Sequence, residues 1–227
     1  MSLKPQDFLV ALKLVALGEQ HWTYARLAGE LGLSASEAHA AVKRGLASGL
    51  LADASIARAH AAAQAPARPL VAHEASAVGL GRPAARQIDK RVAAPARSHL
   101  DSGAVVNRHN LAEFALHGAK YVFPPERLPV GPGVPTSHAA PAFAGVFAPG
   151  HEPLVWPHPQ GSVRGEGLAP LHPCVPGAAL SDPALYELLA LFDALRAGRA
   201  RERGMAQTRL QKLIAPAIPA PAGKRRG

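Results

Sequence analysis

Four polar side chains in one short stretch have the types and spacing needed to hydrogen-bond to a nucleic acid. They are Ser36, His39, Lys43 and Arg44. On a helix, positions 36, 39 and 43 fall on one face and position 44 lies at its edge. Hydroxyl, imidazole, ammonium and guanidinium groups can all bond to the phosphates and base edges of DNA. The spacing therefore predicts a helical face that could enter a groove.

The residues before this face indicate where its helix begins. Ser34 and Glu37 form the sequence pattern of a capping box, in which each side chain bonds to the backbone of the other. Gly32 can end a preceding helix in the left-handed conformation, and Thr23 can cap the start of that helix. We therefore expect a helix, a turn and a second helix within residues 22–51, and we include Thr23 and Ser34 among the DNA-binding residues.

Small and apolar residues are expected on the inner side of this unit. The second helix should bury Ala38, Ala41, Val42 and Leu46. The small side chains of Ala28, Ala38 and Ala41 let two helices cross closely over a short turn, since larger side chains would separate them. Residues 4–18 have helical apolar spacing as well, so three helices should precede Gly49.

Residues 4–55 resemble winged helix-turn-helix regulators of the multiple-antibiotic-resistance-regulator type. The resemblance rests on Ala28, on Gly32 four positions later, and on the exit sequence ASGLL at residues 47–51, where such proteins lead from the recognition helix into a wing strand. It implies a transcriptional regulator that binds double-stranded DNA. The alternative is a three-helix unit that contains such a turn without binding DNA.

The distribution of charge limits where attraction to phosphates could arise. The 227 residues carry a net charge of +9, but residues 1–53 are neutral overall. Residues 57–98 carry +5, residues 99–195 carry −4, and residues 196–227 carry +8. Non-specific attraction to DNA would therefore come mainly from the middle of the chain and its carboxyl-terminal end.

The remaining chemistry-bearing residues do not form a recognisable site. The eleven histidines show no repeated metal-ligand spacing, and Cys174 lies in HPCVPG without the context of a nucleophile. We therefore expect no enzyme, no metal and no cofactor. The single cysteine suits a reducing compartment, and no run approaches the roughly 18 apolar residues of a membrane span, so we expect a cytoplasmic protein that does not contact membranes.

The fold class expected is mainly α with small β: a winged helix-turn-helix, a linker, and a carboxyl-terminal α+β region. Residues 1–56 form the DNA-binding domain, and residues 57–98, rich in Ala, Pro and Arg, form a flexible basic linker that either contacts phosphates or is a solvated tether. Residues 99–214 form an interaction or dimerisation domain, and residues 215–227 a disordered basic tail.

Within the second half, helices are expected at residues 110–119, 182–197 and 199–214. Strands are expected to start at 121–123 and to cover 143–147, 154–156 and 162–168, but none of them should be long because thirteen prolines lie between residues 124 and 176. The helix at 182–197 should present a dimer or interdomain surface. That surface consists of Leu185, Leu188, Leu189, Phe192 and Leu195.

Residues 105–205 loosely resemble regulators found beside small toxins, including winged-helix antitoxins of the type IV abortive-infection kind. The stretches that carry the resemblance are NLAEFALHGAKYVFPPE, GVPTSHAAP, VRGEGLAPLHPCVP and SDPALYELLALFDALRAGRARE. It implies a repressor of its own operon that could also oppose a toxin. Two hypotheses follow: a homodimeric autoregulatory repressor, or an antitoxin whose second half binds a cognate toxin protein. An enzyme ranks last.

Overall fold

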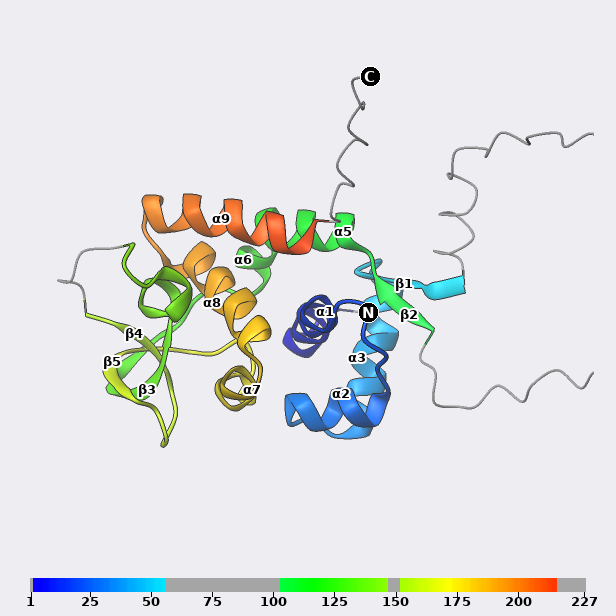
Figure 1. Ribbon diagram of the computed structural model, residues 1–227, viewed down its shortest axis with the longest axis horizontal. Coiled ribbons are helices and arrows are strands. Elements are labelled where there is room, and N and C mark those ends of the chain that lie inside the picture. The colour runs from blue at the N-terminus through cyan, green and yellow to red at the C-terminus, as the bar shows by residue number, and fades with distance from the viewer. Residues whose placement is uncertain (1, 56–102, 147–151, 216–227) are drawn as a thin grey trace, which may run out of the picture.

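The computed structural model of the chain describes residues 2–55, 103–146 and 152–215. Within these ranges the fold is mainly helical with two small sheets, as the sequence predicted at that level (Figure 1). The linker expected at 57–98 and the tail expected beyond residue 215 lie outside the described residues. None of the described helices has the length and apolar composition required to cross a membrane.

The first three helices lie where the sequence predicted them. They are α1 (Pro5–Leu17), α2 (Tyr24–Leu31) and α3 (Ala35–Ala47). The Thr23 hydroxyl accepts a hydrogen bond of 3.1 Å from the amide of Arg26, and Gly32 ends α2 with a φ of 67°. Both hydrogen bonds of the capping box between Ser34 and Glu37 are formed. These local predictions are confirmed.

A strand that follows α3 pairs with a strand distant in sequence. β1 (Leu51–Asp53) is antiparallel to β2 (Ala104–Val106), with Ala52 opposite Val105. Just beyond the ladder, the amide of Ala54 donates to the carbonyl of Gly103. In the sequence, the segment 57–98, expected to connect two domains, is therefore flanked by two strands that pair in one sheet.

The chain then forms one continuous helical segment. It comprises α5 (Arg108–Glu113), the π-helical turn η1 (Phe114–Gly118) and α6 (Ala119–Val122). The predicted cap at Asn110 is wrong, because Asn107 caps the segment and its side chain accepts the amide of Asn110 at 3.2 Å. The strand predicted to start at 121–123 is also wrong. Gly118 keeps a right-handed backbone (φ −104°, ψ −43°), so the helix continues through it.

The proline-rich region forms a small closed barrel of three strands. β3 (Arg127–Thr136) is antiparallel to both β4 (Leu154–Pro157) and β5 (Val163–Leu168), while β4 and β5 are parallel. β4 and β5 confirm two predicted strands. The expectation that no long strand could form is wrong, since β3 has 10 residues. Glycine makes the close packing possible: a Cβ on Gly165 would lie 2.0 Å from the carbonyl oxygen of Pro153.

Two short turns follow β3 in place of another predicted strand. The turns are 3₁₀ helices, η2 (Ser137–Ala139) and η3 (Pro141–Phe143). The strand expected at 143–147 is therefore wrong for its described part, because backbone bonds from Phe143 to Ala140 and from Ala144 to Pro141 close turns. Residue 147 lies outside the described residues.

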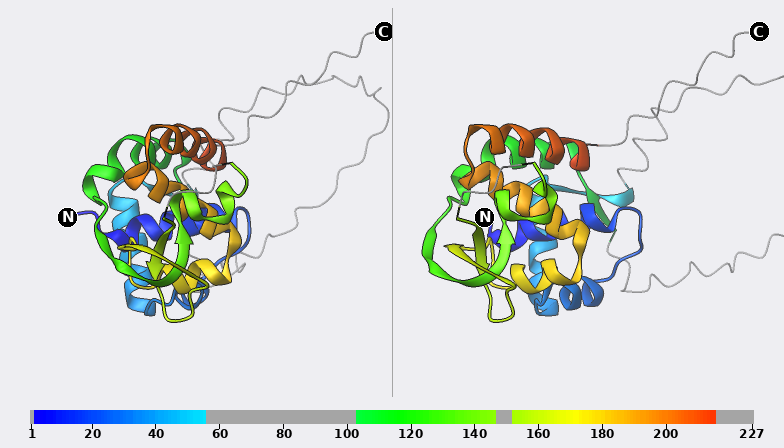
Figure 2. Two further views of the ribbon diagram at one scale, coloured as in Figure 1. Left: turned by 90° about the vertical axis from the view of Figure 1, so that its left-hand side faces the viewer. Right: turned by 60° about the vertical axis from the view of Figure 1, so that its left-hand side comes forward.

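Three helices complete the structure: α7 (Val175–Ser181), α8 (Pro183–Ala197) and α9 (Ala200–Ile214). The sequence predicted α8 and α9 but not α7. Asp182 caps α8 by accepting the amides of Ala184 and Leu185. α9 lies beside both α8 and α5, an arrangement visible from two sides (Figures 1 and 2).

A single hydrophobic core joins the first helices to the last ones. The ring of Phe8 on α1 lies 5.4 Å from the Phe114 ring and 5.0 Å from the Phe192 ring on α8. Five apolar side chains of α8, which the sequence predicted to form a dimer or interdomain surface, are at most 7% exposed. Within one copy of the chain they pack in the core between the first and last helices, so they form an internal contact and not an open surface. They are Leu185, Leu188, Leu189, Phe192 and Leu195.

Candidate nucleic-acid interface

The outer face of α3 carries three of the predicted polar side chains. Ser36, His39 and Lys43 are exposed, while Ala38, Ala41 and Val42 on the opposite side are at most 1% exposed. The helix therefore separates a polar outer face from a small apolar inner face, as its sequence predicted.

The end of α3 differs from this prediction at Leu46. Leu46 was expected in the buried stripe, but its side chain is 40% exposed. Gly45 is buried in its place, because a Cβ there would lie 2.8 Å from a methyl carbon of Leu51. The missing side chain lets β1 approach α3 closely. Leu46 consequently adds an apolar group to the outer surface near the sheet.

The two capping hydroxyls expected to bind DNA have bonds within the protein. Thr23 accepts the amide of Arg26, and Ser34 accepts the amide of Glu37 at 3.2 Å. The Ser34 hydroxyl also donates to the Glu37 carboxylate at 2.7 Å. Hydrogen bonds from the backbone and hydroxyl of Ser34 lower the pKa of Glu37. The position of these groups is thus explained by helix capping, and Ser34 still lies exposed where α3 begins.

His39 rests on an aromatic neighbour from α2. The ring centroids of His39 and Tyr24 are 5.0 Å apart, and Tyr24 in turn lies 5.7 Å from Trp22 in an edge-on arrangement. Partial burial raises the pKa of Tyr24, so its hydroxyl remains protonated at neutral pH. The exposed imidazole of His39 therefore packs at a tilt against Tyr24 of α2.

Arg44 lies away from the other predicted DNA-binding side chains. Its Nε is 2.9 Å from both carboxylate oxygens of Asp7 on α1, and its Nη2 is 2.7 Å from Oδ1. Asp7 is fully buried, and the Arg44 side chain is 19% exposed. Hydrogen bonding to Asp7 raises the pKa of the guanidinium. The structure therefore joins Ser36, His39 and Lys43 on one face but holds Arg44 against α1.

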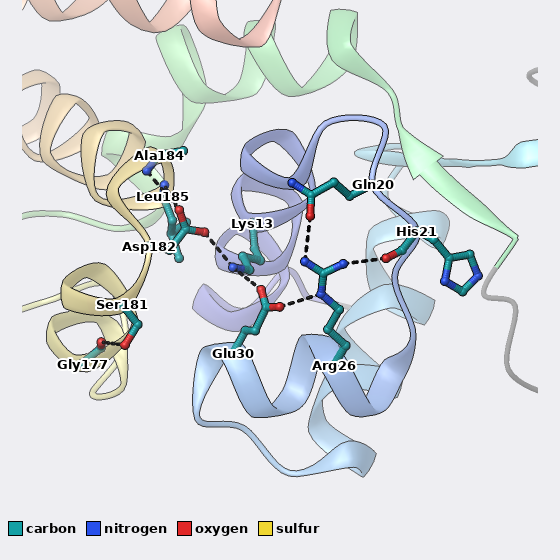
Figure 3. Close-up of polar contacts among 10 residues, drawn as sticks. All are labelled: Lys13, Gln20, His21, Arg26, Glu30, Gly177, Ser181, Asp182, Ala184 and Leu185. Carbon is teal, nitrogen blue, oxygen red and sulfur yellow. Dashed lines mark hydrogen bonds and ion pairs between the residues drawn. The ribbon is translucent and has the colours of Figure 1, made fainter.

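A second buried ion group joins α1 to α2 and α8 (Figure 3). The ammonium of Lys13 lies 2.5 Å from Glu30 on α2 and 2.7 Å from Asp182, the cap of α8. The Lys13 side chain is only 3% exposed. Glu30 also accepts from Arg26 at 2.6 Å, and Arg26 donates to the backbone and side chain of the loop before α2.

The charges of this group shift both carboxyl pKa values in the same direction. Hydrogen bonds from Lys13 and then Arg26 lower the pKa of Glu30. Burial alone would raise the pKa of Asp182, but hydrogen bonds from Lys13 and the amide of Leu185 outweigh it, and the net pKa is lowered. Both groups are therefore ionised at neutral pH and stabilise the buried ammonium.

The loop before α7 touches the turn between α2 and α3. A Cβ on Gly32 would be 3.6 Å from the Cβ of Cys174, and the Cys174 sulfur lies 3.0 Å from Nδ1 of His172. Burial raises the pKa of Cys174 to about 11, so it remains a neutral thiol near pH 7. Burial also lowers the pKa of His172. This pair packs against the turn, and its protonation states do not favour nucleophilic chemistry.

The residues that fix the relation between the two halves were not found from the sequence. In the sequence, Asp7 and Lys13 are recognisable only as charges within an otherwise apolar helix, and Asp182 only as a helix cap. The sequence patterns do not pair them with their partners. Among the described residues, no three metal-binding side chains lie close enough to hold an ion.

Comparisons of the chain with protein-family models, with curated proteins and with solved structures gave no match.

Proposed function

We propose that this chain is a sequence-specific DNA-binding transcriptional regulator that represses its own operon. The observation that carries the proposal is the outer face of α3, where Ser36, His39 and Lys43 are exposed, on a helix that is followed in the chain by β1. In this proposal α2 and α3 are a helix-turn-helix and β1–β2 is the base of a wing. The exposed face of α3 enters the major groove.

The packing of α3 supports this role. Its inner side consists of alanine, valine and glycine, so it lies close to α1 and α2 and leaves the opposite side uncovered. Its outer side offers hydroxyl, imidazole and ammonium groups, which can bond to base edges and phosphates. The small side chain of Ala47 and the apolar group of Leu46 suit contact with thymine methyl groups.

The pairing of charges indicates which parts of the chain would contribute to DNA affinity. Three of the five cations in residues 1–53 already pair with carboxylates, namely Lys13, Arg26 and Arg44. α3 would therefore contribute contacts that position the protein on the DNA, and little electrostatic attraction to the phosphates. In our proposal, the sequences at 57–98 and 196–227, which carry +5 and +8, supply contacts to phosphates, and a second copy of the chain binds a second half-site.

The first experiment identifies the DNA. Genomic fragments that copurify with the chain are sequenced, and binding is then measured to a duplex containing the DNA upstream of the protein's own gene and to a scrambled duplex of the same composition. Enrichment of paired half-sites in that upstream DNA is expected. Equal binding to both duplexes at moderate salt contradicts the proposal.

Lys43→Ala tests the assigned face. We expect it to weaken binding to the upstream duplex and to reduce the slope of log affinity against log salt by about 1, because one phosphate contact is lost. The matched control is Lys120→Ala on α6, which removes a lysine outside the proposed interface. Equal salt slopes for the Lys43 variant and the unaltered chain would count against the groove assignment.

The antitoxin hypothesis concerns a protein partner for the second half. Exposed apolar side chains at the end of α6 favour such a partner: Tyr121 is 76% exposed and Val122 is 49% exposed. Coexpression with the product of the neighbouring gene, followed by purification through the regulator, tests it. A stable complex that is lost in Tyr121→Ser would support the toxin as a partner, and separate elution of the two proteins would contradict it.

A further inference from the structure

We propose that Arg44 is a positioning residue: it fixes how α3 lies on α1 through Asp7, and it does not itself contact DNA. This inference rests on the proposed function, because it concerns how the DNA-facing helix is held. It also reverses the role that the sequence pattern assigns to Arg44.

The geometry of the pair restrains Arg44 strongly. Asp7 is 0% exposed and receives three hydrogen bonds from the guanidinium, with distances of 2.7 to 2.9 Å. Its Oδ2 also accepts the amide of Lys4 at 2.8 Å, where α1 begins. If Arg44 turned toward DNA, a fully buried carboxylate would lose its counter-charge, which is strongly unfavourable.

The location of the pair explains what it positions. Asp7 lies in the first turn of α1, and Arg44 lies in the last turn of α3. A planar guanidinium that bonds a carboxylate through two nitrogens fixes both the separation and the rotation of the groups it joins. Lys43 precedes Arg44 on the same helix, so any rotation of α3 that breaks the pair also moves Lys43 and His39 relative to a groove.

Asp7→Asn separates the two possible roles of Arg44, because one role predicts a rise in DNA affinity and the other predicts a fall. If Arg44 contacted DNA, weakening its internal partner would release a cation, and both affinity and salt slope would rise. If Arg44 positions α3, affinity for the upstream duplex falls by about tenfold or more, as expected when two or three base contacts are misaligned. The salt slope then does not rise, because no cation is released toward the DNA, and binding to the scrambled duplex is retained.

Two variants control for a general loss of stability. Arg127→Met removes one partner of an exposed ion pair with Glu166 in the barrel and should leave DNA affinity unchanged. Asp7→Asn combined with Arg44→Met removes both partners, so no unpaired charge remains. We expect this double variant to lose about as much specific affinity as Asp7→Asn alone, because the two residues act as one unit. A double variant that binds tenfold more weakly than the single variant would overturn the inference.

Hydrogen exchange tests, without DNA, whether the Arg44–Asp7 pair holds α3 in place. Amides of residues 35–47 should exchange faster in Asp7→Asn than in Arg127→Met, while those of residues 183–197 should be unchanged. If the unaltered chain does not distinguish the two duplexes, the proposed function fails and hydrogen exchange alone decides the positioning role. Unchanged exchange in residues 35–47, or a rise in affinity for Asp7→Asn, overturns the inference.

Discussion

Asp193 shows how one residue can hold together segments that are distant in sequence. Its carboxylate is 2% exposed and accepts the Thr136 hydroxyl at 2.8 Å, the Trp156 indole at 2.6 Å and Nε of Arg196 at 2.7 Å. These partners come from β3, β4 and α8 itself. One charge inside an apolar helix therefore docks the small barrel on the helical core.

Replacing this carboxylate should destabilise the whole chain. Asp193→Asn leaves the buried Arg196 guanidinium without its counter-charge, and breaking such a pair costs about 3 kcal/mol or more. Urea denaturation followed by circular dichroism would measure the loss in the free energy of unfolding. Glu166→Gln is the control, because its pair with Arg127 is exposed and such pairs contribute about 1 kcal/mol or less. Equal effects of the two substitutions would contradict the docking role.

At the scale of elements, several helix ends were predicted correctly from local chemistry, whereas the pairing of strands with distant partners was not predicted. Thr23, Gly32, Ser34 and Asp182 mark helix ends through bonds to their own neighbours, so a sequence window contains the whole signal. β1 instead depends on β2, about fifty residues later, and β3 depends on two partner strands at once. β3 was not predicted because its sequence is rich in proline and its hydrogen bonds form only with the two partner strands of the barrel.

The same limit applied to the candidate interface. The face of Ser36, His39 and Lys43 follows from helical periodicity, which is local. The pairing of Arg44 with Asp7 spans 37 residues, and that of Lys13 with Asp182 spans 169 residues. The residues adjacent to Arg44 and Lys13 in the sequence do not indicate these partners. For this reason the inward-facing Arg44 was predicted to face DNA.

The ion group of α1, α2 and α8 should make stability depend on pH. Glu30 and Asp182 have lowered pKa values when folded, so their stabilising contribution is present above the unfolded values near 4 and is lost as the pH falls through the folded values. Lys13→Met removes the cation that lowers both values. We expect the difference in free energy of unfolding between the unaltered chain and this variant to be largest at about pH 7 and to shrink toward about pH 3.

Denaturant titrations of both proteins across this range would measure that difference. Arg127→Met provides the control, since it leaves Lys13 and both of its partners in place. A difference that stays constant from neutral to acidic pH would show that Lys13 contributes by packing and not through the two carboxylates.

At the scale of the whole molecule, the packing of α1 determines whether the amino-terminal helices can fold independently. Five consecutive residues of α1, from Phe8 to Leu12, are 0% exposed, so this helix is enclosed on every side. α3 covers one side and α8 another, and Phe8 packs on the ring of Phe192. The domain boundary expected near residue 57 would therefore cut through one continuous hydrophobic core.

Two shortened chains test this view of the molecule. A fragment of residues 1–56 should lack a cooperative thermal transition, because removing α8 exposes one side of α1 and leaves Lys13 without Asp182. Replacing residues 56–102 with a short Gly/Ser loop should preserve the transition, since β1 and β2 are adjacent antiparallel strands and loops of about two to five residues join such strands. Calorimetry and circular dichroism would compare both with the full chain. Cooperative unfolding of the 1–56 fragment would show that α1, α2 and α3 form an independent domain. If the fragment does not unfold cooperatively while the loop-replaced chain does, α3 and the second half share one folding unit. A partner bound by α8 or its neighbours could then act on α3 through α1.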